Sequence, residues 1–171
     1  MLQRALDTPW LGTVEFAPSA LLALVLDRPV AADYFGLTLL RKDPDVRDLV
    51  AICVAQRKLA SLVPPERGLL VCLGSAAANP ELVADPEQGV QRMLRVVERV
   101  FPATRDHVMR AKLYRHMEGY PVFYPGYFRK LRDFPAHALP AGLQLAGDYL
   151  VAPTVEGAMR SGVRAAEALL R

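Results

Sequence analysis

The stretch LAGDYLVAPTVEGAMRSGVRAAEALL, residues 145–170, decides how this chain is organised. The apolar segment Gly142–Ala146 overlaps its start and predicts a short strand, and Asp148 follows that strand after one glycine. Beyond a loop, Thr154 is a residue type that caps helices, and the segment from Val155 onward predicts a helix. The order is therefore strand, acidic residue, loop and helix.

Such a unit brings two kinds of polar group to one place. It sets a carboxylate at the carboxyl end of a strand, where ligands of open α/β sheets bind, and it directs the free N–H groups of a helix N-terminus into the same crevice. Gly157 and Gly162 lie inside the expected helix, and each costs about 1 kcal/mol relative to alanine. Something must therefore approach the helix backbone closely. Two explanations remain open: a sheet packed on the helix, or a cofactor lying against its first turn.

Upstream of this unit, hydrophobic periodicity and chain breakers predict several strands and a long helix. Asp85 is the expected cap of a helix over Pro86–Phe101, whose apolar residues form one stripe. Thr13–Leu26 predicts two short strands or one bulged strand, because Pro18 interrupts it. The remaining expected elements are strands over Tyr34–Arg41, Val50–Gln56, Leu69–Gly74 and Asp106–Arg115 and a short helix over Tyr127–Arg132. We expect an α+β fold in which helices pack on a mixed, largely antiparallel sheet.

Composition limits the classes of protein to which the chain can belong. A chain of 171 residues with 52% hydrophobic residues can bury a sizeable core. The net charge of +3 comes from scattered basic residues, so we expect no nucleic-acid binding, only mild attraction to anions such as phosphates or acidic membrane surfaces. Cys53 and Cys72 stand in apolar contexts and the three histidines are not clustered, so we expect reduced buried thiols and no metal site.

The sequence also predicts where the protein resides. The first sixteen residues lack the basic region and apolar core of a signal peptide, and the longest apolar run, Ala20–Leu26, is too short to cross a bilayer. We therefore expect a cytoplasmic protein, and leave open an association with membranes through peripheral contact.

The closing stretch resembles the C-terminal signature of the FAD-dependent amine oxidase superfamily, which includes protoporphyrinogen oxidases and phytoene-type desaturases. In that group LAGD, a short loop, a hydroxyl or aromatic residue, VEGA or MEGA, and a small-residue helix follow one another. LVLDRP, GLLVCLGS, MRAKLYR and YPG resemble upstream segments of the same enzymes more loosely. The resemblance implies that residues 1–139 are the substrate-domain half and that residues 140–171 are the strand-loop-helix that completes an FAD-binding domain.

The resemblance also implies the residues that contact the cofactor. They are Gly147, Asp148, Thr154, Val155, Glu156 and Gly157. Asp148 would accept a hydrogen bond from a ribityl hydroxyl, Gly147 would permit close approach, and the Val155 N–H would meet the pyrimidine edge of the flavin. A helix N-terminus stabilises the negative charge that a reduced flavin carries near this edge.

One half of the family pattern is missing from the sequence. None of the eleven glycines falls into a GxGxxG motif, so no segment is expected to cradle the pyrophosphate of FAD. We expect the chain to be a fragment, a truncated gene product or one subunit of a split enzyme whose dinucleotide-binding half lies on a separate chain. Alone, the chain should bind FAD weakly or not at all and should be inactive.

The substrate class follows from a second departure. Amine-oxidising members commonly carry an aromatic residue before the MEGA-like segment, where this chain has Thr154. The resemblance therefore implies a large apolar substrate, of porphyrinogen or polyene type, that is oxidised or desaturated by hydride transfer to flavin. Five aromatic residues could line its pocket or simply pack in a core: Tyr120, Phe123, Tyr124, Tyr127 and Phe128. No catalytic residue is identified, and the alternative function is a non-catalytic α+β module that binds an apolar ligand or a partner chain.

Overall fold

The computed structural model describes residues 9–40, 42–134 and 139–170. The chain divides into two compact units, one of Met1–Ala17 with Tyr120–Arg171 and the other of Pro18–Gly119. The two units are defined by how compactly their residues pack. The boundary expected near residue 139 separates a substrate-binding part from a cofactor-binding part, and it stays a prediction.

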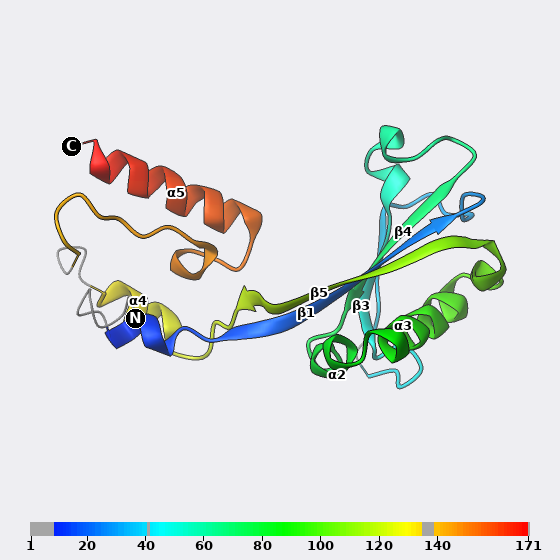
Figure 1. Cartoon of the computed structure of the whole chain (residues 1–171), viewed down its shortest axis with the longest axis horizontal. Helices are drawn as coiled ribbons and strands as arrows, with labels where there is room; N and C mark the ends of the chain where they lie inside the picture. Colours follow the sequence, from blue (N-terminus) through cyan, green and yellow to red (C-terminus); the bar gives the residue numbers. More distant parts are fainter. Residues whose placement is uncertain (1–8, 41, 135–138, 171) are drawn as a thin grey trace. The chain divides into compact units, whose positions relative to one another are not determined.

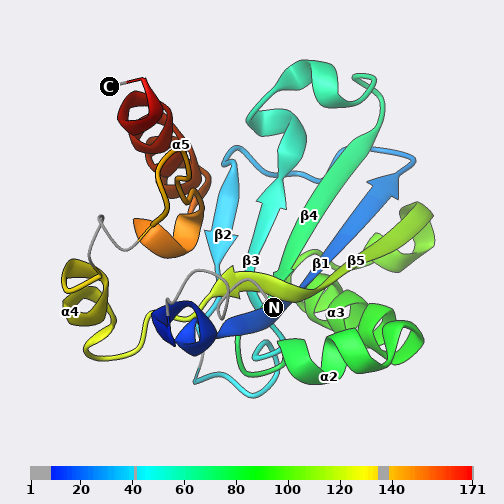
Figure 2. The same cartoon turned by 60° about the vertical axis from the view of Figure 1, so that its left-hand side comes forward.

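A five-stranded antiparallel sheet organises the Pro18–Gly119 unit, with the strand order β2-β3-β4-β1-β5 (Figure 1, Figure 2). The strands are β1 Phe16–Leu26, β2 Gly36–Thr38, β3 Leu49–Val54, β4 Gly68–Gly74 and β5 Val108–Pro121. Two helices, α2 Asn79–Ala84 and α3 Pro86–Val100, follow β4. The expected α+β fold with a largely antiparallel sheet is confirmed.

Strand alternation separates the two faces of this sheet. Leu22, Leu24 and Leu26 of β1 are completely or almost completely buried, while the residues between them are half-buried. In the antiparallel register Leu22 lies opposite Cys72 and Leu24 lies opposite Leu70, so these residues share one face. That face forms the core with the buried residues of α2 and α3, among them Leu82, Val83, Met93 and Val97.

Local signals specify α3 more completely than α2. The Asp85 carboxylate accepts a hydrogen bond from the Gln88 amide at 3.0 Å and Pro86 opens the helix, as the sequence predicts. By contrast, α2 is preceded by Ala78, which offers no capping side chain. This explains why the sequence does not predict α2.

All five strands differ in extent from their predictions. β3 ends at Val54, because Ala55–Arg57 forms a 3-10 turn, and β4 begins one residue early, at Gly68. β1 is one strand, and Pro18 lies before its paired stretch with β4, which begins at Leu21. β2 has only three residues, and the expected end at Arg41 lies outside the described residues. β5 begins at Val108, after a 3-10 turn at Thr104–His107 that includes the expected start at Asp106, and it runs on to Pro121. The sequence does not predict this end, because the pattern of residues does not change at Arg115.

The other unit contains a 3-10 segment η1 at Pro9–Thr13, helix α4 at Tyr127–Arg132, a 3-10 turn η6 at Asp148–Leu150 and helix α5 at Val155–Leu169. Both helices are confirmed. The strand expected over Gly142–Ala146 is wrong: the segment is irregular. A strand exists through backbone pairing with a neighbour, and no described strand pairs with this segment. None of the described helices is long and apolar enough to cross a membrane.

Candidate functional site

A compact turn holds Asp148. The amide of Leu150 donates to the Gly147 carbonyl at 3.2 Å, and the amide of Val151 donates to the Asp148 carbonyl at 3.0 Å. Within the turn, Oδ1 of Asp148 accepts a hydrogen bond from the Tyr149 amide at 3.0 Å. The other carboxylate oxygen has no hydrogen-bond partner among the described residues, so it is available to a ligand.

The N-terminus of α5 supplies donors to the same segment. The Thr154 hydroxyl accepts a hydrogen bond from the Gly157 amide at 3.0 Å, which confirms the predicted cap. In the described part of the chain the amides of Val155 and Glu156 meet no acceptor. They are orphan donors at the positive end of a fifteen-residue helix, where an anion or a carbonyl group is stabilised.

The loop between the turn and the helix packs directly on α5. The Gly147 amide donates to the hydroxyl of Ser161, a residue only 3% exposed, at 3.0 Å. A Cβ on Gly157 would collide with the carbonyl oxygen of Ala152. The close approach that the sequence requires at Gly157 is therefore made by the loop backbone. At Gly162, by contrast, a Cβ would meet no described residue within 4 Å outside the backbone of its own helix.

The structure gathers the six predicted site residues into this turn, loop and first helical turn, although their contact with a cofactor stays a prediction. A Cβ on Gly147 would collide with the ring of Tyr149, so the chain itself fills part of the space expected to be free there. Glu156 points its carboxylate to Arg160 at 3.5 Å, and both side chains are exposed. Only the Glu156 backbone amide, and not its side chain, belongs to the cluster of donors.

Two residues of this site are not found by sequence reasoning. Ser161 anchors Gly147, and the Tyr127 hydroxyl donates to the Tyr149 carbonyl at 2.8 Å. The sequence marks Tyr127 as one of five clustered aromatic residues, and its ring is 1% exposed, which favours core packing for this member. Its bond to a residue 22 positions later has no local sequence signal.

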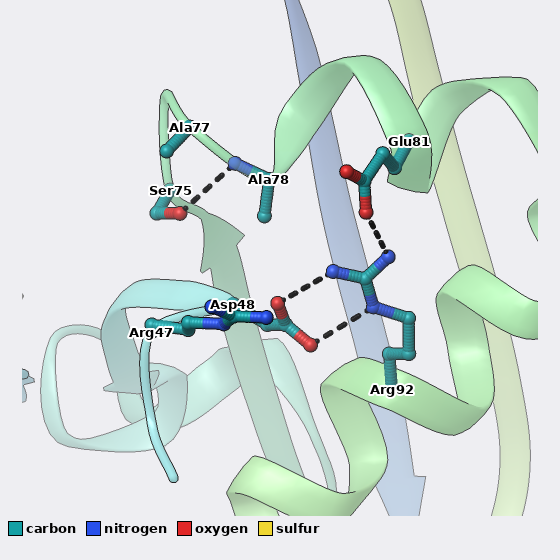
Figure 3. Close-up of a pocket in the computed structure, with 7 residues that line it drawn as sticks. All are labelled: Arg47, Asp48, Ser75, Ala77, Ala78, Glu81 and Arg92. Carbon is teal, nitrogen blue, oxygen red and sulfur yellow. Dashed lines mark hydrogen bonds and ion pairs between the residues drawn. The ribbon is translucent and has the colours of Figure 1, made fainter. Parts of the chain in front are cut away.

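A second polar cluster lies in the Pro18–Gly119 unit, which contains the sheet (Figure 3). A cavity of about 260 Å³ is lined by Arg47, Asp48, Ser75, Ala77, Ala78, Glu81 and Arg92. Arg92 donates to both carboxylate oxygens of Asp48, at 3.0 and 2.7 Å, and also to Glu81. The Ser75 hydroxyl accepts a hydrogen bond from the Ala78 amide at 3.2 Å. Arg92, Asp48 and Glu81 satisfy one another's hydrogen-bonding groups. The cluster therefore connects Asp48, the residue before β3, to helices α2 and α3, and it does not resemble a catalytic centre.

The pair of Asp48 and Arg92 predicts a pH-dependent stability. Hydrogen bonds from Arg92 hold the pKa of the Asp48 carboxyl below its ordinary value. The stabilisation is therefore present above the unfolded-state pKa of about 3.9 and is lost as pH falls through the lower folded-state pKa.

We expect Arg92→Met to lower the free energy of unfolding by about 1–3 kcal/mol at pH 7. The difference from wild type should shrink in urea titrations as pH falls from the unfolded-state pKa of about 3.9 through the lower folded-state pKa. Arg99→Met is the control, because Arg99 and Asp45 form an exposed pair. An Arg92 effect that does not depend on pH would contradict this account.

Metal chemistry has no candidate site in the residues described: no group of three or more His, Cys, Asp or Glu side chains converges there. Cys53 and Cys72 are free thiols. Burial raises the pKa of the Cys72 thiol to about 12, so this cysteine stays protonated at neutral pH.

Comparisons with known proteins give one family and several related folds. Residues 8–170 match the family model described as flavin containing amine oxidoreductase. The crystal structure of a proposed protoporphyrinogen oxidase from Exiguobacterium sp. 255-15 matches 99% of this chain with a TM-score of 0.77 and 17% identity, over 39% of its own chain. An oxidoreductase from Methanosarcina mazei matches 96% of this chain with a TM-score of 0.61 and 19% identity, over 38% of its own chain.

A more distant similarity reaches the structure of reduced UDP-galactopyranose mutase, with a TM-score of 0.58 and 11% identity over 71% of this chain and 25% of that one. At these identities the matches show a shared fold. The chain spans between 25% and 39% of the length of these three solved proteins. No curated protein matches the chain.

Proposed function

Because this chain belongs to the family of flavin-containing amine oxidoreductases, we propose that it forms the part of an FAD-dependent oxidoreductase that holds the flavin end of the cofactor. One observation carries the proposal: the orphan amides of Val155 and Glu156 and the free carboxylate oxygen of Asp148 belong to segments that pack on each other. FAD, when bound, would supply the redox step by accepting a hydride from the substrate.

The donor and acceptor set fits the flavin end of FAD. The carboxylate can accept a hydrogen bond from a ribityl hydroxyl, and the two amides can donate to the carbonyl groups of the pyrimidine ring. A helix N-terminus acts as roughly half a positive charge, so α5 would stabilise the anionic form of a reduced flavin. These residues would bind and orient the cofactor, and no residue is assigned to proton transfer.

The remainder of the FAD site would come from a dinucleotide-binding half, on a longer chain or on a separate subunit. Support comes from the exposed side of α5, where apolar residues recur at helical spacing. Val155 is 80% exposed, Met159 67% and Val163 58%. Because a soluble helix normally turns such a stripe toward a partner, we propose that this half packs here.

An apolar face of the sheet supports a large apolar substrate. On the face opposite α2 and α3, the antiparallel register places three pairs of aliphatic side chains across β1 and β4: Leu21 with Leu73, Ala23 with Val71 and Val25 with Leu69. Ala51 and Cys53 of β3 continue the same face. Antiparallel sheets commonly turn polar side chains to water on one side, so two apolar faces favour a ligand or a protein on the second.

Cations on β5 favour the porphyrinogen type over the polyene type. Leu113 packs against the helix-covered core, and Arg115 donates to the Val83 carbonyl of α2, so these alternate residues face the helices. Lys112 and Tyr114 then face the other side, where the Lys112 ammonium lies 4.5 Å from the Tyr114 ring centroid. A porphyrinogen has an apolar macrocycle with carboxylate groups that a cationic edge would attract, whereas a polyene hydrocarbon has none.

This substrate assignment predicts that the apolar face of the sheet binds a porphyrin with free carboxylates more tightly than an uncharged one. We expect the chain to bind protoporphyrin IX about twofold to fivefold more tightly than its dimethyl ester, measured by porphyrin fluorescence, because only the acid can pair with the exposed Lys112. Lys112→Glu should remove most of this difference, whereas Arg99→Glu on α3, which covers the other face, should preserve it. Equal binding of acid and ester, or binding of a carotene alone, would contradict the porphyrinogen assignment.

A non-catalytic module that binds an apolar ligand or a partner chain remains the second candidate, because the same apolar sheet face would serve it. Flavin separates the two candidates. Mixing the chain with a dinucleotide-binding half that carries a GxGxxG motif should quench FAD fluorescence if the chain completes an oxidoreductase. The module would bind porphyrin yet leave FAD fluorescence unchanged.

A cytoplasmic location with peripheral membrane contact also stays a prediction.

A further inference from the structure

Tyr127 connects α4 to the Asp148 turn. Its side chain is 1% exposed, and its hydroxyl donates to the Tyr149 carbonyl at 2.8 Å. The ring stacks on Phe123 at a centroid distance of 4.3 Å and an interplanar angle of 13°. Tyr124 meets the same ring edge-on at 5.4 Å. The aromatic contacts hold the ring in one orientation, and the hydroxyl is thereby directed at the backbone of the turn.

The residue that Tyr127 contacts is the one that orients the Asp148 carboxylate. The Tyr149 carbonyl accepts from Tyr127, while the Tyr149 amide donates to Oδ1 of Asp148 at 3.0 Å. A displacement of the Tyr149 backbone would therefore disturb the hydrogen bond that orients the carboxylate. Ser161 fixes the preceding residue through the Gly147 amide, so the turn is held from both sides.

The protonation state suits this role at any physiological pH. Burial raises the pKa of the Tyr127 hydroxyl to about 12, and the neighbouring Tyr124, Tyr149 and Asp148 act in the same direction. Tyr127 therefore remains a hydrogen-bond donor at physiological pH. A buried phenol without an acceptor would be destabilising, and the Tyr149 carbonyl is an acceptor within hydrogen-bonding distance.

We infer that Tyr127 is a positioning residue of the flavin site, which holds the Asp148 turn so that the free carboxylate oxygen is presented to the ribityl chain. The inference rests on the proposed function. Tyr127 itself touches neither cofactor nor substrate in this account, and its effect is transmitted through the Tyr149 backbone.

The first test uses amide hydrogen exchange on the full chain. Tyr127→Phe keeps the ring and removes the hydroxyl, so we expect the turn amides of Leu150 and Val151 to exchange about threefold to tenfold faster. Tyr124→Phe is the matched control, because its hydroxyl lies 3.1 Å from the Lys130 ammonium and does not contact the turn. Unchanged exchange at Leu150 and Val151 in Tyr127→Phe would overturn the inference.

The second test measures ligand binding after addition of a GxGxxG half. We expect Tyr127→Phe to raise the Kd for FAD up to about tenfold, because one hydrogen bond is lost. The Kd for ADP should be unchanged, because ADP contacts only the dinucleotide-binding half. A merely structural role would move both constants or the melting temperature. If wild type binds FAD and Tyr127→Phe binds it equally well, the positioning role is overturned alone. If wild type does not bind FAD, the proposed function fails and this inference fails with it.

Discussion

Asp148→Ala is expected to weaken FAD binding about 10-fold to 100-fold when the chain is combined with a dinucleotide-binding half. The substitution removes the carboxylate oxygen that is free to accept from the ribityl chain, and a hydrogen bond to a charged group contributes about 1.5–3 kcal/mol. It also removes the contact between Oδ1 and the Tyr149 amide, so the turn loses its internal support. The Kd for FAD, measured by flavin fluorescence, reports the sum of both losses.

Two controls separate these losses. Asp148→Asn keeps an oxygen that can accept from the Tyr149 amide, so its loss of affinity should be smaller than that of the alanine variant. Asp133→Ala removes an exposed carboxylate that pairs with Arg132 in α4 and should leave FAD binding unchanged. Equal affinities of wild type and Asp148→Ala for FAD would show that Asp148 does not bind the cofactor.

Gly157→Ala is expected to destabilise the packing of the loop on α5 by about 1–3 kcal/mol. The added Cβ would collide with the Ala152 carbonyl oxygen, so either the loop or the helix must shift. The intrinsic gain of about 1 kcal/mol for alanine over glycine in a helix only partly offsets this cost. Faster exchange of the amides at positions 157 and 158, which both donate to Thr154, would report the change. Local exchange does not require a two-state transition of the whole chain.

Gly162→Ala is the matched control in the same helix. No described residue outside the backbone of α5 lies within 4 Å of a Cβ at Gly162, so the substitution should slow amide exchange in α5 through the alanine preference alone. Slower exchange in both variants would contradict the close packing of Ala152 on Gly157. If Gly162→Ala weakens association with the dinucleotide-binding half, that half approaches the helix at Gly162.

The elements with complete local signals were predictable from the sequence. Asp85 and Thr154 are caps whose side chains bond to the third residue of the helix that follows, and both helices begin where these residues predict. Helix α2 lacks such a signal because Ala78 precedes it. The strand expected over Gly142–Ala146 did not form because a strand depends on a pairing neighbour, which a local apolar run does not specify.

The residue types of the candidate site were predictable from the sequence, but the tertiary contacts that hold these residues in place were not. The acidic residue and the capped helix are recognisable in the sequence, and the structure brings them into one segment. The loop carbonyl that fills the space at Gly157 and the Tyr127 hydroxyl that holds Tyr149 are tertiary contacts. No period of a helix or strand encodes them, so only the folded chain reveals them.

The role of the Asp148 turn in holding the flavin is tested by the fluorescence of FAD titrated with this chain and with a dinucleotide-binding half that carries a GxGxxG motif, added separately and together. We expect little quenching by the chain alone and saturable quenching by the two together, which Asp148→Ala weakens and Asp133→Ala does not. FAD fluorescence that stays unchanged in a stable complex of the two parts, or quenching that is the same with Asp148→Ala, would contradict the claim that the Asp148 turn and the N-terminus of α5 hold the flavin.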